Sequence, residues 1–365
     1  MSQFYQFISR KPLTLLVLAL PLALIAEISH WGELWVFIFS ALSVIPLAEY
    51  IGEGTEALTA YTSPRIGGLL NATLGNAAEL IIAIIAIREG LLELVKASIT
   101  GSILGNLLLV MGLAMVYGGV RHGLQTFDRK NATRNAILLV LAVVALVIPS
   151  ILSHYIGEPT ATNTRVETLS LGVAAVMIIL YGLALMYSFR SEGAPLSHKP
   201  AEEIIHKPGW SVRTALIVLG LATAGIVLAS ELLVGAVEPV VESLGVSEFF
   251  LGIILIPIVG NVAEHLVAVE VAGRNMMDLS VEIAIASSLQ IALFVAPVLV
   301  FISLLLGHPL QLIFNQFELL ALIVGVVITA LVSADGESNW LEGVELLAVY
   351  LILGLAFFLL PTIPG

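Results

Sequence analysis

The sequence predicts an all-α polytopic membrane protein with eleven transmembrane helices, in which one extra helix precedes two inverted five-helix repeats. Of the 365 residues, 59% are hydrophobic and only 12% are charged, whereas a soluble domain has roughly a quarter of its residues charged. Apolar runs of about 20 residues recur along the chain, and as a helix such a run crosses a ~30 Å hydrocarbon layer. A five-residue motif also returns 185 residues later, at 75–79 and 260–264.

The apolar runs define the expected domain organisation. The N-terminal extra helix occupies 1–33, the first repeat 34–189, a linker 190–211 and the second repeat 212–365. Arg10 and Lys11 precede the first run as in a signal peptide, but no small-residue cleavage pattern follows, so we expect a mature helix. The eleven expected helices are 12–30, 34–61, 66–89, 97–119, 134–156, 165–189, 212–240, 249–272, 279–306, 309–332 and 341–361.

Basic residues predict the orientation, because they are enriched in cytoplasmic loops. With the N-terminus in the cytoplasm, 12 of the 15 basic residues face inside and the C-terminus is non-cytoplasmic. Those expected outside are Arg88, Lys96 and Arg165. Those expected inside are Arg10, Lys11, Arg65, Arg121, Arg129, Lys130, Arg134, Arg190, Lys199, Lys207, Arg213 and Arg274.

The repeated motif indicates two halves of opposite topology. Gly-Asn-Ala-Ala-Glu at 75–79 lies in the third expected helix, and Gly-Asn-Val-Ala-Glu at 260–264 lies in the eighth, which crosses in the other direction. The same 185-residue offset pairs Ser102 with Ser287. An offset of 182 in the preceding helices pairs Glu49 with Glu231 and Glu56 with Glu238. Inverted repeats of this kind are a common plan of secondary transporters.

The two glutamates of the motif are the candidate chemical centre. A carboxylate at the middle of a span costs about 2.5–3.5 kcal/mol, and a divalent cation or protons would remove that penalty for both Glu79 and Glu264. Asn76 and Asn261 lie three residues before them, on the same helix face. Gly75 and Gly260 can loosen each helix and free carbonyl oxygens, and Ca²⁺ prefers such oxygen ligands. Neutral packing glutamates are the alternative, but they do not account for the symmetry.

Further polar residues line the expected pathway. Glu49, Glu56, Glu231 and Glu238 would form acidic vestibules that concentrate cations, although Glu56 and Glu238 are equally understood as ordinary helix-end charges. His265 adjoins Glu264 and would relay protons or sense pH, or it is a packing residue. Ser102, Asn106, Ser287 and Gln290 stand in the helices that follow the motifs, where polar side chains also join helices.

These motifs resemble those of a known family. GNAAELI at 75–81 and GNVAEH at 260–265 resemble the paired signatures of the Ca²⁺/H⁺ antiporters, the CAX branch of the cation/Ca²⁺ exchanger superfamily. The first motif has Ala77-Ala78 where the family often has Ala-Thr. The resemblance implies that Glu79 and Glu264 bind Ca²⁺ and carry the exchanged protons. It also implies a role for the polar stretches after the motifs, at 101–106 and 287–290. The strongly acidic stretch of vacuolar members is nearly absent, since only Glu202 and Glu203 stand between the halves.

The expected function is therefore exchange of Ca²⁺ for H⁺ by alternating access in a prokaryotic plasma membrane. Selectivity among divalent cations and homo-oligomer formation stay open. A net charge of −12 argues against nucleic-acid partners, and the absence of cysteine excludes disulfides and thiolate metal sites. We expect no enzymatic activity and no organic cofactor. A Na⁺/Ca²⁺ exchanger of the same architecture is the alternative, although its Gly-Thr-Ser-x-Pro-Glu pattern does not match. A channel or an intramembrane enzyme accounts less well for two paired carboxylates.

Overall fold

The computed structural model describes residues 12–156, 164–188 and 210–360, and nearly all of them are helical. The linker expected at 190–211 therefore lies outside the described residues except for its last two. The first half of the chain contains η1 (Pro12–Leu18), α2 (Ala19–Ile28), α3 (Glu33–Thr59), α4 (Pro64–Leu74), α5 (Ala77–Arg88), α6 (Leu92–Leu104), η2 (Gly105–Val110), α7 (Met111–His122), β1 (Gln125–Thr126), α8 (Arg129–Ile156) and α9 (Thr164–Ser188).

η2 in the first half of the chain, and η3 and η4 in the second, are short π-helical segments inside longer helices. The second half also consists almost entirely of helices. It contains α11 (Val212–Gly235), α12 (Val237–Leu244), α13 (Glu248–Phe250), η3 (Leu251–Leu255), α14 (Ile256–Gly273), α15 (Met277–Gln290), η4 (Ile291–Val295), α16 (Ala296–Leu306), α17 (Gln316–Val332), β2 (Glu337–Ser338) and α18 (Trp340–Phe358).

Among the described residues, eight helices are long and apolar enough to cross a bilayer, and a ninth span results if α4 and α5 are counted as one bent helix. Two shorter apolar helices, Leu13–Ile28 and Gln316–Val332, complete the set. Each of the eleven predicted segments thus coincides with an apolar helix. The number of spans remains a prediction, because two of these helices are short for a full crossing.

One predicted helix boundary is wrong for a local reason. The tenth helix is expected from 309 but begins at Gln316, because Asn315 and Glu318 form a capping box that fixes its start. The seventh, expected over 212–240, corresponds to one apolar span, Val212–Leu244. This span has a turn at Ala236 between α11 and α12, and α12 is capped by Gly245 in the left-handed conformation.

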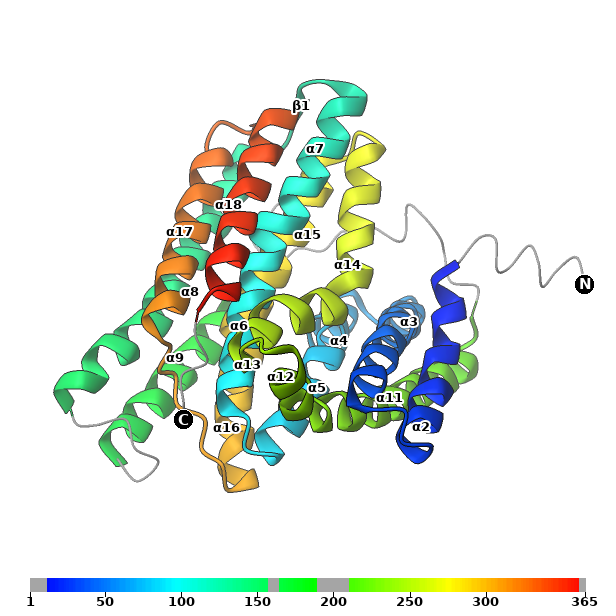
Figure 1. Cartoon of the computed structure of the whole chain (residues 1–365). Helices are drawn as coiled ribbons and strands as arrows, with labels where there is room; N and C mark the ends of the chain where they lie inside the picture. The colour runs from blue at the N-terminus through cyan, green and yellow to red at the C-terminus, as the bar shows by residue number, and fades with distance from the viewer. Residues whose placement is uncertain (1–11, 157–163, 189–209, 361–365) are drawn as a thin grey trace, which may run out of the picture.

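Helices from the two halves pack against each other throughout the molecule. In Figure 1, α7, α14, α15 and α18 stand close together, while α2, α3 and α11 form the opposite side. α3 packs along α11, α6 against η3, and α7 against both α14 and α18. Glycines permit the closest approach of α7 and α18: a side-chain carbon added at Gly343 would lie 2.6 Å from the Gly112 carbonyl oxygen. Small residues of this kind allow the close helix packing typical of membrane proteins.

A small polar structure ties three loops together at one end of the molecule. β1 pairs antiparallel with β2, with Gln125 opposite Ser338. His122 Nε2 lies 2.8 Å from the Gly273 carbonyl oxygen, and the Asp128 amide donates to Asp278 Oδ1 at 2.7 Å. The loops at this end are therefore joined by hydrogen bonds.

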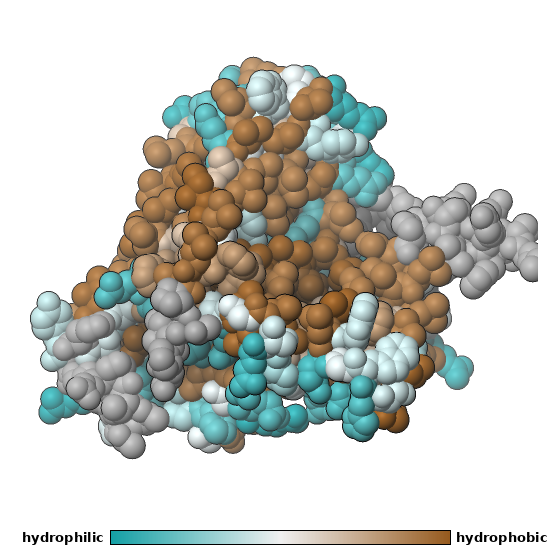
Figure 2. Space-filling model, in the orientation of Figure 1, coloured by the Kyte–Doolittle hydropathy of each residue, from teal (hydrophilic) through white to brown (hydrophobic). Residues whose placement is uncertain are grey.

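The surface has the pattern expected of a protein immersed in lipid. Figure 2 shows a broad hydrophobic band with hydrophilic residues concentrated above and below it. Many large apolar side chains are exposed along the helices, for example Leu221, Leu351 and Leu331. A soluble monomer rarely exposes apolar patches of this extent, so the chain is a multi-pass membrane protein.

Candidate functional site

The first motif interrupts its helix. α4 ends at Leu74 and α5 begins at Ala77, with a bend of 44° between them. Gly75 permits the break, since a side-chain carbon there would lie only 2.6 Å from the Asn71 carbonyl oxygen. Glu79 then stands in the first turn of α5, where the positive end of the helix dipole favours a negative charge.

The second motif does not interrupt its helix, so the loosening expected at Gly260 is not seen. α14 runs unbroken from Ile256 to Gly273 and contains both Asn261 and Glu264. The distortion of this helix lies earlier, in the π-helical turn Leu251–Leu255. Pro257 follows that turn and has no backbone N–H to donate, so a local change in hydrogen bonding just before it is expected.

The two motifs meet in space. A side-chain carbon at Gly260 would lie 3.5 Å from Glu79 Oε1, so the carboxyl of the first motif packs against the backbone of the second. Glu264 Oε2 accepts a hydrogen bond of 2.6 Å from Ser287. Glu79 Oε2 is buried and has no hydrogen-bond partner in the part of the chain that the structure describes.

Both asparagines are held by neighbours from the other half of the chain. Asn76 Nδ2 donates to the Ala72 carbonyl oxygen at 3.3 Å and to Gln290 Oε1 at 2.6 Å. Asn261 Nδ2 donates to the Pro257 carbonyl oxygen at 3.0 Å and to Ser102 Oγ at 3.2 Å.

The backbone carbonyls fix which way each amide points, because a carbonyl oxygen only accepts. The side-chain oxygens of both asparagines therefore point away from these partners. Neither accepts a hydrogen bond from the described residues, so both remain available to a cation.

The helices that follow the motifs complete the polar cluster. Ser102 and Asn106 lie on α6 and η2, Ser287 and Gln290 on α15, and all four are buried. Asn106 Nδ2 is buried without a hydrogen-bond partner among the residues described. The π-helical segments η2 and η4 start at 105 and 291, nearly at the 185-residue offset, and π-turns inside helices frequently accompany functional sites.

The four glutamates expected to form the vestibules are less buried than the polar cluster. Glu49 and Glu56 are half-buried on α3, whereas Glu231 and Glu238 are exposed on α11 and α12. Glu231 Oε1 lies 3.2 Å from Arg88 Nη1 at the end of α5. This ion pair could not be predicted from the sequence, since 143 residues separate Arg88 and Glu231.

His265 follows Glu264 directly in α14. It is buried, and its Nε2 atom has no hydrogen-bond partner in the described segments.

The sequence analysis did not single out Glu318, a fully buried carboxyl at the start of α17. Its Oε2 atom accepts from the Asn315 backbone amide at 2.7 Å, which is the capping box noted above, so we assign it a structural role.

The donor set of the cluster suits a hard cation. It offers two carboxylates, two oriented amide oxygens and a serine hydroxyl, and Ca²⁺ takes six to eight oxygen ligands. No group of three or more His, Cys, Asp or Glu residues poised to hold a metal occurs within the described ranges. All the donors of the cluster are oxygen atoms, the ligands that suit hard cations such as Ca²⁺ and Mg²⁺.

Known proteins are similar to this chain in sequence and in fold. The model of the family described as sodium/calcium exchanger protein matches residues 32–190 and 214–359. A Ca²⁺/H⁺ antiporter of Aphanothece halophytica is 45% identical, with 96% of each chain covered. The Ca²⁺/H⁺ antiporter ChaA of Bacillus subtilis is 44% identical over 95% of this chain and 98% of its own.

Solved structures agree with this assignment. The native structure of YfkE has a TM-score of 0.82 and 42% identity, covering 95% of this chain and all of that one. A H⁺/Ca²⁺ exchanger CAX matches in fold, with a TM-score of 0.71 at 16% identity and 96% and 92% of the chains covered. The chain therefore belongs to the sodium/calcium exchanger protein family, in its Ca²⁺/H⁺ antiporter branch.

Proposed function

We propose that the protein exchanges Ca²⁺ for protons by alternating access, with Glu79 and Glu264 shared between the two substrates. The observation that carries this proposal is the contact of the Glu79 carboxyl with the Gly260 backbone, which joins the two motifs in one cluster. The unpartnered Glu79 Oε2 atom supports it, because a buried carboxylate oxygen without a donor is costly unless a cation or a proton neutralises it. The printed names of the relatives, Ca²⁺/H⁺ antiporter, agree with it.

Charge balance gives the exchange mechanism. Ca²⁺ brings two positive charges and cancels two carboxylates, while two protons do the same by making both carboxyls neutral. Burial disfavours the charged form of an unpaired carboxyl, so an ionised, empty site is the unfavourable state. Because Ca²⁺ and protons use the same two carboxylates, the site cannot bind both at once. If only the loaded states change sides, the movements of Ca²⁺ and protons are then coupled.

The same proposal includes the topology. It has eleven spans, with helix one as an addition, an inverted pair of repeats at 34–189 and 212–365, and a cytoplasmic N-terminus. The family model matches the chain in two segments, 32–190 and 214–359, and their bounds support this division into halves. Arg121, Arg129 and Arg274, all expected in the cytoplasm, are close in sequence to the joined loops at the β1–β2 end. With an odd number of spans, a cytoplasmic N-terminus gives a non-cytoplasmic C-terminus. The bacterial source of the relatives supports a prokaryotic plasma membrane.

The remaining polar residues receive supporting roles. Glu49 and Glu56 would line one access path and Glu231 and Glu238 the other, each attracting cations. His265 would pass protons to or from Glu264. Asn76, Asn261, Gly75 and Gly260 would contribute oxygen ligands to Ca²⁺, and the four polar residues on the following helices would hold these ligands in place.

Transport in proteoliposomes tests the function. Purified protein is reconstituted and Ca²⁺ uptake is followed after a pH jump that makes the lumen acidic, with no Na⁺ present. We expect uptake that stops when a protonophore collapses the pH gradient, and none with Glu79→Gln. Uptake that requires an outward Na⁺ gradient and ignores pH would instead establish Na⁺/Ca²⁺ exchange, which the family description also includes.

A further inference from the structure

An ion pair joins the first motif helix to a helix of the second half of the chain. Arg88, the last residue of α5, has its Nη1 atom 3.2 Å from Glu231 Oε1 on α11. Its Nε atom lies 3.0 Å from Oε1 of the neighbouring Glu89. The side chains of Arg88 and Glu231 are 52% and 43% exposed, so the pair lies at the surface. Glu231 is one of the residues proposed above to line an access path, and here a guanidinium contacts one of its carboxylate oxygens.

The α3–α11 helix pair lies against both motif helices, because α3 packs on α14 and α11 packs on α5. The two helices of the pair run antiparallel: a side-chain carbon at Gly225 would meet Leu47, and one at Gly54 would meet the Ala215 carbonyl oxygen. Glu231 follows Gly225, so it lies toward the beginning of α3, the end expected to be non-cytoplasmic. An access path that reaches the polar cluster from that end, beside Glu231, would run along the contact of α11 with α5.

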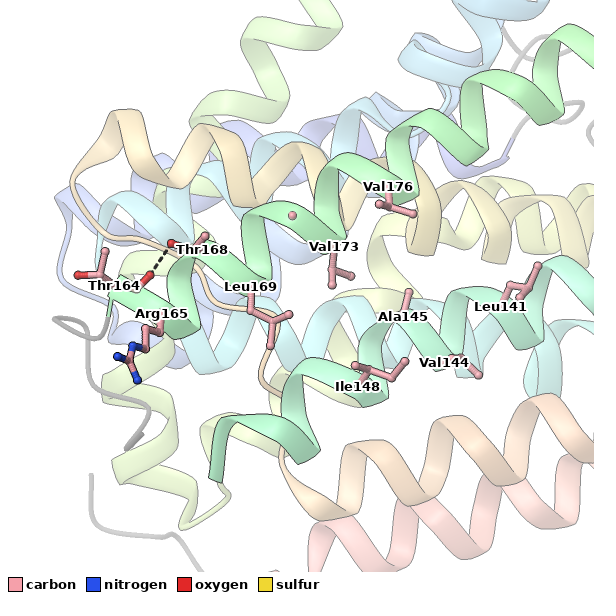
Figure 3. A pocket seen from close by; sticks show the side chains of 11 residues that line it. Leu141, Val144, Ala145, Ile148, Thr164, Arg165, Thr168, Leu169, Val173 and Val176 are labelled. Atoms are coloured by element: carbon pink, nitrogen blue, oxygen red, sulfur yellow. Dashed lines mark hydrogen bonds between the residues drawn. The ribbon is translucent and has the colours of Figure 1, made fainter. Parts of the chain in front are cut away.

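Helices α8 and α9 pack elsewhere in the molecule. α8 lies against α15 and α17, and α9 against α16. Figure 3 shows the groove between α8 and α9, whose walls are apolar side chains such as Val144 and Val173. Opening a path along α11 requires only that the α3–α11 pair shift against α5 and α14, so these other contacts can stay as they are.

The residues at the equivalent positions of the second half do not form this ion pair. The 185-residue offset matches Arg88 with Gly273, which has no side chain to reach α3. The same offset matches Glu89 with Arg274, and Arg274 Nη2 pairs with Glu270, four residues earlier in the chain. Inverted repeats make the two access states similar in packing, so a contact present on one side only can favour one of these states over the other.

We propose that Arg88 is a latch on the non-cytoplasmic access path: its ion pair with Glu231 holds α11 against α5 and keeps that path closed. The latch rests on the alternating access and the orientation proposed above. When α11 shifts, Arg88 keeps Glu89 as a charge partner, so the guanidinium is not left alone. An exposed ion pair changes an equilibrium by no more than about fivefold. The latch therefore biases the two access states without preventing their exchange.

Cross-linking tests whether α5 and α11 separate during transport. The chain contains no cysteine, so Arg88→Cys/Glu231→Cys carries only the two thiols that a short, reducible bifunctional reagent would link. Neither residue is a proposed Ca²⁺ ligand, so the unlinked variant should retain part of its proton-driven Ca²⁺ uptake in proteoliposomes. Linking should remove that uptake, and cleaving the link should restore it. The matched control is Glu270→Cys/Arg274→Cys, an ion pair of similar exposure at the end of α14, whose uptake should be the same before and after linking.

Labelling tests the latch without requiring transport. In a Glu264→Cys background, a membrane-impermeant maleimide is added outside intact bacterial cells that express the protein. Arg88→Gln removes the ion pair and should speed this labelling by up to about fivefold, the shift expected of an exposed ion pair, whereas Arg274→Gln should leave the rate unchanged. Uptake that survives the link between positions 88 and 231, or equal labelling rates in the two arginine variants, would overturn the latch. Absence of proton-driven uptake in the unaltered protein would instead count against the proposed function.

Discussion

Asn76 donates a hydrogen bond of 2.6 Å to Gln290 across the boundary between the two halves of the chain. The Asn76 amide also donates to the Ala72 carbonyl oxygen. The two hydrogen bonds together fix the orientation of the amide, so the side-chain oxygen points away from both partners. Asn261 is oriented in the same way, but by Ser102 rather than by a glutamine. The two amides of a symmetric motif are thus positioned by partners that are not symmetric.

Replacing Gln290 tests whether it positions Asn76. Gln290→Met keeps the size but removes the acceptor, which frees the Asn76 amide to rotate. We expect Ca²⁺ affinity to fall by up to about tenfold, since a typical hydrogen bond contributes roughly 0.5–1.5 kcal/mol. Isothermal titration in detergent measures it. Ser288→Ala, two residues away on the same helix, is the control, and equal affinities for the two variants would contradict the positioning role.

The central carboxyls should be indispensable for exchange. Glu79→Gln and Glu264→Gln keep the side-chain shape but cannot ionise, so each should abolish proton-driven Ca²⁺ uptake while the melting temperature stays within a few degrees. Glu56→Gln and Glu238→Gln remove the same charge farther along the proposed path and should slow uptake only in part. Normal exchange by either central variant would show that the two carboxyls do not form one shared site.

Much of this arrangement could be predicted from the sequence, and the rest depends on tertiary contacts. Motif spacing and opposite topology predicted that Glu79 would approach the second motif, as its contact with Gly260 shows. The same Gly-Asn pair breaks one helix and leaves the other intact, because Pro257 places the distortion earlier and its counterpart at the 185-residue offset is Ala72.

Contacts between distant residues left no local signal. The Arg88–Glu231 ion pair and the hydrogen bond of Gln290 depend on how helices rotate about their axes. The apolar pattern does not determine that rotation, since most faces of these helices are apolar. Gly101 is a third example, because only the packing of α6 against η3 shows why a glycine is needed there.

Gly101 is predicted to be essential for this packing. A side-chain carbon there would lie 2.0 Å from the Ile253 carbonyl oxygen and 2.7 Å from Pro257 Cγ, and a backbone oxygen cannot simply move aside. Gly101→Ala should therefore destabilise the protein by about 1–3 kcal/mol, the usual cost of overpacking. A carbon at Gly105, one turn later, meets nothing within 4 Å. Gly105→Ala is the matched control in thermal unfolding, and equal melting temperatures would refute the tight crossing.

Competition between Ca²⁺ and protons should make the affinity for Ca²⁺ fall as the pH falls. Ca²⁺ binds the ionised carboxylates, so lowering the pH fills Glu79 and Glu264 with protons and weakens Ca²⁺ binding, and each Ca²⁺ bound should release protons. If both carboxyls start protonated, about two protons leave per Ca²⁺, one for each carboxylate that the ion requires. Titrations at several pH values, in buffers of different ionisation enthalpy, measure affinity and proton release together.

His265 is the companion measurement for that experiment. If it passes protons to Glu264, His265→Ala should slow exchange while leaving the number of protons released per Ca²⁺ unchanged, because the carboxyls still bind them. A variant in which proton release itself falls would place a proton on His265 rather than on the carboxyls. A Ca²⁺ affinity that stays the same between about pH 5 and 8, together with no proton release, would exclude competition between Ca²⁺ and protons at the two glutamates.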